Sequence, residues 1–69
     1  MDRTPVASSN IGSIGYDPES STLEIEFLNG SIYQYFDVNE NVYTDLISAG
    51  SVGQYFSANI RGIYRFSRI

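Results

Sequence analysis

The side chains in this sequence best suited to binding chemistry are arginines near its C-terminus. Three of the four arginines lie within the last nine residues, at positions 61, 65 and 68. A guanidinium is planar and can hold a phosphate or a carboxylate through two parallel hydrogen bonds. We expect Arg61, Arg65 and the neighbouring Tyr64 to form a ligand patch. The alternatives are an ordinary cation at a helix C-terminus for Arg61, and an amphipathic edge strand for Tyr64 and Arg65.

Two tyrosines offer a second kind of contact. Tyr33 and Tyr35 are two residues apart in a run of strand-forming residues, so they point to the same side of a strand. If exposed, they form a platform on which nucleobases stack, with each stack worth roughly 1–3 kcal/mol. If buried, they belong to the hydrophobic core.

The turn before these tyrosines decides between the two alternatives. A two-residue turn at Asn29-Gly30 would place the tyrosines on the solvent side, opposite glutamates. A three-residue turn with a glycine bulge would instead pair Tyr33 with Ile25. Tyr35 would then pair with Leu23. We favour the bulged register, which makes the tyrosines mostly core, with their hydroxyls near an edge.

A helix start supplies a third candidate. Ser51 and Gln54 are spaced as in a capping box, with Gly53 between them. Free N–H groups at a helix start bind anions, and serine with glycine allows close approach of a ligand. Ser51 and Gly53 are therefore candidate ligand contacts. The stronger alternative is that Ser51 only caps the helix.

Ordinary catalytic side chains are missing, because the sequence contains no His, no Cys and no Lys. Without them, no group titrates near neutral pH unless a carboxylate or a tyrosine is strongly shifted. Ser8 and Ser9 have no evident base to activate them. We therefore expect no enzyme activity, no cofactor and no zinc-type metal site.

The balance of charge limits the partners. The formal net charge is −4, and an acidic chain repels long polyanions, which argues against binding to duplex DNA or RNA. No apolar run approaches the ~20 residues of a membrane span, and the N-terminus does not resemble a secretory signal. We expect a cytoplasmic protein that binds neither duplex DNA nor membranes.

Hydrophobic spacing predicts the elements that position these residues. Alternation predicts a strand over residues 22–27, with Phe27 in the core, and a second strand over residues 31–38. A short edge strand is expected near Ile14 and Tyr16. Residues 63–69 alternate again, either as a fourth strand or as an extended tail. Helical spacing predicts one helix from an Asn39 cap to Gly50 and another from Ser51 to Gly62.

Strands clustered before helices predict an α+β fold. We expect a small antiparallel sheet of three to four strands, followed by a short helical hairpin packed on one face. Residues 1–7 are predicted to be a flexible N-terminal arm. Residues 8–69 form a single domain, since a chain of 69 residues has room for no more.

An ordered set of residues carries a family resemblance over residues 6–69, with the Tyr-x-Tyr centre as its signature. The matching residues are Ser8-Ser9, Ile14-Gly15-Tyr16-Asp17, Leu23, Phe27, Gly30, Tyr33-Gln34-Tyr35, Val38, Ala49, Ser51, Gly53, Tyr55-Phe56, Ile60-Arg61 and Arg68-Ile69. In this set the chain resembles the KTSC family, whose domains occur alone in bacteria and phages and at the C-terminus of some lysyl-tRNA synthetases. The resemblance implies RNA binding, through the attachment to a synthetase.

These observations predict a non-catalytic binding module for a nucleotide-like ligand, either a small phosphorylated nucleotide or a short single-stranded RNA. A phage-type protein that sequesters a nucleotide signal would fit the size and the missing catalytic groups. The alternative is a protein-interaction or self-assembling domain that uses exposed aromatic surface. We expect a homo-oligomer, because aromatic residues make up 14% of so short a chain and leave apolar surface to cover.

Overall fold

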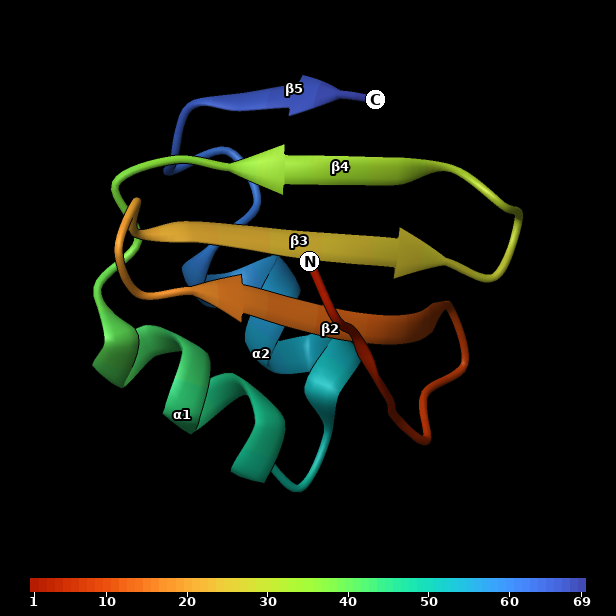
Figure 1. Ribbon diagram of the computed structural model, residues 1–69. Coiled ribbons are helices and arrows are strands. Elements are labelled where there is room, and N and C mark those ends of the chain that lie inside the picture. Colours follow the sequence, from red (N-terminus) through yellow and green to blue (C-terminus); the bar gives the residue numbers. More distant parts are fainter.

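The computed structural model describes residues 1–69 and contains five strands and two helices (Figure 1). In chain order the elements are β1 (Thr4–Pro5), β2 (Ile11–Asp17), β3 (Thr22–Phe27), β4 (Ile32–Tyr35), α1 (Glu40–Ser48), α2 (Val52–Asn59) and β5 (Phe66–Arg68).

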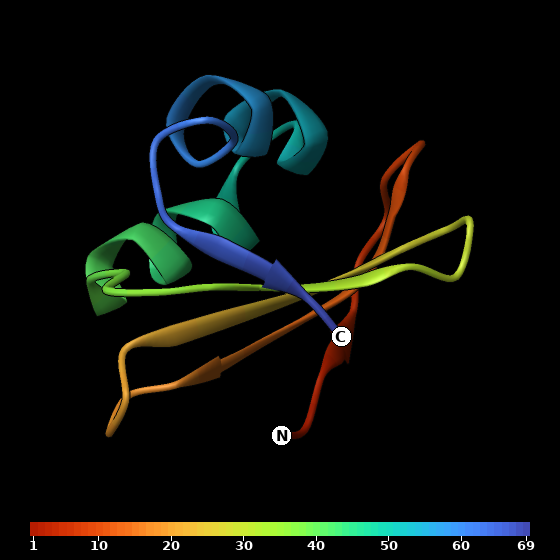
Figure 2. The same ribbon diagram turned by 90° about the horizontal axis from the view of Figure 1, so that it is seen from above.

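The strands form one antiparallel sheet whose spatial order, β1-β2-β3-β4-β5, is the order of the chain. Short turns join successive strands from β1 to β4, and such turns can connect only antiparallel neighbours. Both helices lie on one face of the sheet, and the N-terminus lies on the other side (Figure 2). The α+β class is confirmed, with five strands rather than three or four. The alternation over residues 63–69 corresponds to the short edge strand β5, which pairs with β4.

The register between β3 and β4 is the bulged one. Tyr33 pairs with Ile25, and Tyr35 pairs with Leu23. The Phe27 N–H donates to the Ser31 carbonyl at 2.9 Å and closes a three-residue turn. Gly30 takes a φ of 93° in this turn, a conformation that glycine adopts without a steric penalty. The tyrosines therefore face the helices, as the favoured register predicts.

Both predicted helix caps are present. The Asn39 side chain accepts a hydrogen bond from the Asn41 N–H, and the Ser51 hydroxyl accepts one from the Gln54 N–H. The helices end earlier than predicted. The first ends at Ser48 and the second at Asn59, and Gly62 lies in the following turn with a φ of 77°.

The core lies between the sheet and the helices. Its buried members are Ile11, Ile14, Leu23, Ile25, Tyr35, Val38, Leu46, Val52, Phe56 and Ile60. Phe27, expected in the core, is only half-buried and packs against the edge of this cluster. It lies in the last position of β3, where the helical layer gives way to an open cleft.

The N-terminal residues contribute to the sheet. Residues 1–7, predicted to be a flexible arm, include β1, which pairs with β2 through Thr4 opposite Ile14 and Pro5 opposite Ser13. The strand predicted near Ile14 and Tyr16 is confirmed as β2, but its short length and edge position are wrong, because β2 has seven residues and lies between β1 and β3. Proline is tolerated in β1 because this strand is itself an edge.

The start of the chain also crosses the face of the sheet away from the helices. A Cβ at Gly15 would lie 2.6 Å from the Asp2 carbonyl oxygen, so only glycine allows this approach. Arg3 then forms a salt bridge with Glu24, and Gln34 donates a second hydrogen bond to Glu24 at 2.9 Å. Glu24 is 5% exposed although it lies on the open face.

Acid should weaken the fold through Glu24. Burial alone raises the pKa of Glu24, but hydrogen bonds from Gln34 and Arg3 and the charge of Arg3 outweigh it, so the pKa lies below its ordinary value of 4.5. The unfolded chain therefore binds more protons in this range. The stabilisation is complete above the unfolded pKa and is lost as the pH falls through the folded pKa.

Thermal melts between about pH 7 and pH 3 check this expectation. The melting temperature of Glu24→Gln should fall less steeply with acid than that of the wild type. Glu19→Gln, a change in an exposed turn, is the control and should follow the wild type. An equally steep decline in Glu24→Gln would contradict the assignment.

Candidate functional site

Five aromatic rings from both layers of the fold form a connected cluster, called here the aromatic cluster: Phe27, Tyr33, Tyr35, Phe56 and Phe66. Their ring centroids lie 5.6–6.4 Å apart in each contacting pair. The spacing suits edge-on and tilted packing of aromatic side chains.

Burial is graded across the aromatic cluster. Phe56 on α2 and Tyr35 on β4 are 4% and 5% exposed and belong to the core. Phe27 and Tyr33 are half-buried. Phe66 on β5 is 58% exposed, and its ring centroid lies 5.7 Å from that of Tyr33 and 5.9 Å from that of Tyr35. The cluster is therefore core at one end and solvent-accessible surface at the other.

A cleft of about 480 Å³, called here the aromatic cleft, opens over this cluster. All five rings line it, together with Asn10, Asn29, Ser31, Ser57 and Arg61. The polar members come from the loop before β2, the β3–β4 turn and the end of α2. Half of the lining residues are thus aromatic, and the others are neutral hydrogen-bonding groups and one cation.

Arg61 is that cation. It follows α2, and its backbone N–H donates to the Phe56 carbonyl at 3.0 Å, a hydrogen bond that closes the C-terminal end of the helix. Arg3 and Arg65 each form a salt bridge, whereas Arg61 has no carboxylate within 4.0 Å. Its guanidinium is therefore free to meet an anion in the cleft.

The surroundings of Tyr35 shift the pKa of its hydroxyl. Burial raises the pKa of Tyr35 above its ordinary value of 10.0, and the nearby Tyr33 raises it further, while the positive charge of Arg61 lowers it. The hydroxyl therefore stays protonated at neutral pH and can donate a hydrogen bond.

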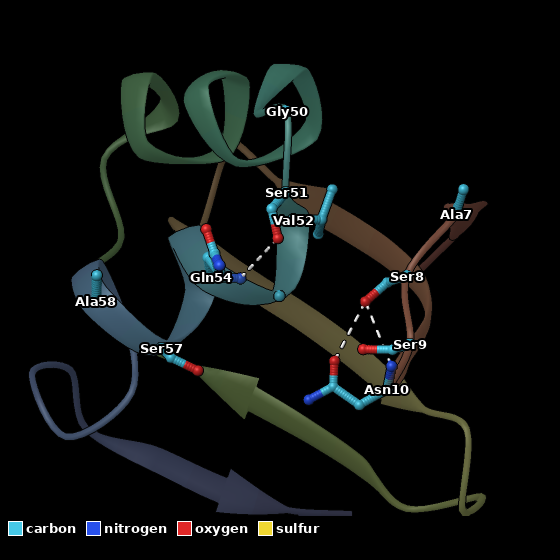
Figure 3. Close-up of a pocket in the computed structure, with 11 residues that line it drawn as sticks. Ala7, Ser8, Ser9, Asn10, Gly50, Ser51, Val52, Gln54, Ser57 and Ala58 are labelled. Atoms are coloured by element: carbon cyan, nitrogen blue, oxygen red, sulfur yellow. Dashed lines mark hydrogen bonds between the residues drawn. The ribbon is translucent and has the colours of Figure 1, made fainter.

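A second cleft, called here the polar trough, lies between the loop at residues 7–10 and α2 (Figure 3). Its volume is about 710 Å³, and no charged residue lines it. The polar side chains that line it are Ser8, Ser9, Asn10, Ser51, Gln54 and Ser57. Gly53 also lines it, and in Figure 3 the side chains of Ser8 and Asn10 face α2 across the opening.

The residues singled out in the sequence divide among three places. Tyr33, Tyr35 and Arg61 line the aromatic cleft together. Ser51 and Gly53 line the polar trough. The structure places Tyr64 and Arg65 in neither cleft.

The predicted patch of Arg61, Tyr64 and Arg65 does not form, because the turn after α2 separates its members. Arg65 instead pairs with Asp37 at 2.7 Å, and its guanidinium carbon lies 5.6 Å from the centre of the Phe36 ring. Tyr64 is half-buried against the core.

Sequence reasoning missed Phe66 and Phe56 as cleft residues, as well as Asn10 and Ser57. The alternation near the C-terminus gave a usable signal for Phe66, since pairing of that segment with β4 places Phe66 beside Tyr35. No local signal exists for Asn10 or Ser57, which meet only through the packing of α2 over the sheet.

Two further features of the structure concern metal ions and membranes. The structure contains no group of three or more acidic side chains arranged to hold a metal ion. Neither helix is long and apolar enough to cross a membrane.

The fold and the clefts together define a small α+β domain with a meandering antiparallel sheet and two helices on one face. The model of the KTSC domain family matches residues 7–64 of the chain. The chain belongs to the KTSC domain family.

Relatives include both free-standing and fused domains. The crystal structure of a KTSC domain protein from Yersinia pestis is 43% identical, covers 99% of this chain and 96% of its own, and superposes with a TM-score of 0.94. An uncharacterized protein of Stutzerimonas stutzeri is 40% identical over 100% of this chain and 99% of its own length. The lysine–tRNA ligase of Nostoc punctiforme is 41% identical over 88% of this chain, which spans 11% of the ligase.

Proposed function

We propose that this domain is a non-catalytic binding module for a nucleotide-like ligand, with the base in the aromatic cleft and the phosphate at Arg61. The observation that carries the proposal is that a free guanidinium and five aromatic rings line one cleft. Aromatic faces accept any nucleobase, and a guanidinium is well matched to phosphate oxygens.

The dimensions and burial of the cleft support this proposal. A volume of about 480 Å³ falls within the usual range of small-molecule sites, roughly 300–1,000 Å³. Phe66 and Tyr33 keep ring surface accessible at the cleft mouth, while Phe56 and Tyr35 fix the floor. A buried floor under an exposed rim lets a flat ring enter without repacking of the core.

The charge distribution favours a small or single-stranded ligand over a duplex. Arg61 is the one cation of the cleft, and the whole chain has a net charge of −4. A single arginine makes too few phosphate contacts to hold a double helix. The occurrence of related sequence within lysine–tRNA ligases is in keeping with a short single-stranded RNA. A small phosphorylated nucleotide fits the same contacts.

The non-catalytic part of the proposal rests on the lining residues. The aromatic cleft contains no carboxylate and no group that would act as a general base near neutral pH. The tyrosine on its floor has a raised pKa and holds its proton. These groups bind and orient a ligand, but they do not activate a nucleophile.

Arg61→Ala should weaken binding of adenosine 5′-monophosphate at least tenfold, or about 1.4 kcal/mol, because a directional guanidinium–phosphate contact is lost. Isothermal titration calorimetry measures the affinity, and a thermal melt checks the fold. Arg61 is exposed, so the melting temperature should stay near that of the wild type.

Arg65→Ala is the matched control, since it removes the same charge outside both clefts. It should bind as the wild type does. Equal losses in the two variants would indicate a general charge effect. The proposal would be contradicted if the wild-type protein bound neither the mononucleotide nor a short single-stranded RNA.

A second candidate function is self-association, favoured by apolar side chains near the C-terminal edge of the sheet. Ile63, Phe66 and Ile69 are 63%, 58% and 63% exposed, and β5 presents an unpaired edge. Salt separates the two functions, because phosphate capture weakens as ionic strength rises and an apolar contact does not. Native mass spectrometry of the purified protein reports copy number and retained small ligands in one measurement.

A further inference from the structure

The aromatic cleft and the polar trough adjoin. Asn10 and Ser57 line both of them, one from the loop before β2 and the other from α2. Gly53 and Ser57 are four residues apart on α2 and lie on the same side of the helix. Arg61 lies in the turn after α2 and lines the aromatic cleft together with Ser57.

The two clefts differ in chemistry. The trough offers hydroxyl and amide groups without any charge, whereas the aromatic cleft offers ring faces and a guanidinium. Neutral donors and acceptors are suited to sugar hydroxyls and to the edges of bases. Each cleft by itself, at about 710 and 480 Å³, has the volume of a complete small-molecule site.

Gly53 allows the loop at residues 8–10 to lie close to α2 along the trough. A Cβ at this position would lie 3.0 Å from the Asn10 Oδ1 and 3.4 Å from the Ser8 Oγ. A side chain at this position would therefore contact Asn10 and Ser8 and occupy part of the trough.

We infer that the ligand of this domain has two nucleoside units joined by phosphate, a dinucleotide or two successive nucleotides of a single strand. This inference rests on the proposed function. One base stacks in the aromatic cleft with a phosphate oxygen at Arg61. The chain passes between Asn10 and Ser57, and the second nucleoside lies in the polar trough, where Ser8, Gln54 and the neighbouring groups meet its hydroxyls and base edge.

The test compares adenosine 5′-monophosphate with the dinucleotide adenylyl-adenosine, each of which carries one phosphate. Titration calorimetry on the wild type should show the dinucleotide binding at least tenfold more tightly, because only the dinucleotide fills both clefts. Equal affinities would overturn the two-unit inference and leave the proposed function intact. Binding of neither ligand would overturn the proposed function itself.

Gly53→Leu places a side chain in the trough, where it would meet Asn10 and Ser8. It should remove the advantage of the dinucleotide, so that dinucleotide affinity falls to the mononucleotide level and falls more than mononucleotide affinity does. Equal losses for both ligands would overturn the assignment of the trough as a separate subsite. Thr44→Leu adds the same side chain to an exposed position on α1 outside both clefts, and it should bind both ligands as the wild type does. If a melt shows that Gly53→Leu does not fold, the ratio of the wild-type affinities for the dinucleotide and the mononucleotide tests the two-unit inference by itself.

Discussion

Phe56→Ala should leave the domain largely unfolded at room temperature. Phe56 is 4% exposed, and its ring centroid lies 5.6 Å from those of Phe27 and Tyr35. Removing a buried phenylalanine costs about 3–5 kcal/mol, through lost transfer free energy and the cavity that remains. A domain of this size has roughly 5 kcal/mol of stability in total. Circular dichroism melts should show a transition far below that of the wild type.

Phe66→Ala is the matched control for this experiment. It is the same chemical change in the same aromatic cluster, at a side chain that is 58% exposed. Its melting temperature should remain close to that of the wild type, since the Phe66 side chain buries little apolar surface when the chain folds. Similar losses in both variants would mean that burial within the cluster is not graded as described.

Tyr35→Ala should lower stability and nucleotide binding together. Tyr35 is 5% exposed and belongs to the core, yet it also forms part of the floor of the aromatic cleft. The loss of its ring should cost about 3–5 kcal/mol by the same cavity argument as for phenylalanine. Because the floor collapses with the core, affinity for adenosine 5′-monophosphate should fall in parallel.

Tyr35→Phe separates packing from hydrogen bonding. It keeps the ring and removes the hydroxyl, so the melt should stay near that of the wild type. Calorimetry on this variant then reports what the hydroxyl contributes to binding. Retained nucleotide affinity in a well-folded fraction of Tyr35→Ala would show that the tyrosine does not form the cleft floor.

The dual position of Tyr35 links the fold to the proposed site. The bulged turn at residues 28–30 sets the register that directs Tyr33 and Tyr35 toward α2. A two-residue turn would direct both rings to the opposite face. The position of these rings in the cleft therefore depends on the length of the turn, which differs by one residue between the two registers.

Features that depend on near neighbours in the chain could be predicted from the sequence. The caps at Asn39 and Ser51 each use an N–H two or three residues ahead, so residue type and spacing were sufficient. The hairpin register followed from a glycine at a position that needs positive φ and from the alternation of β3. Choosing the bulged turn also required the argument that apolar faces must match across a pair of strands.

Features that join distant segments could not be predicted in this way. Pairing of β1 with β2 uses backbone groups only, and Pro5 gives no strand signal. The burial of Glu24 depends on Arg3 crossing the sheet from 21 residues away. The separation of Arg65 from Arg61 depends on the turn after α2, where Gly62 adopts a positive φ that redirects the chain.

By itself the sequence determined the α+β class, the helix starts, the hairpin and the residue types available for binding, because each of these follows from local conformation or composition. Only the tertiary structure decided that Arg61 lies at a cleft with Phe66 and that Asn10 lies opposite Gly53. Asn10 and Gly53 are distant in the chain, and the turn after α2 separates Arg61 from Phe66. Their proximity results from the packing of α2 on the sheet and from the return of β5 to β4, which no local pattern specifies.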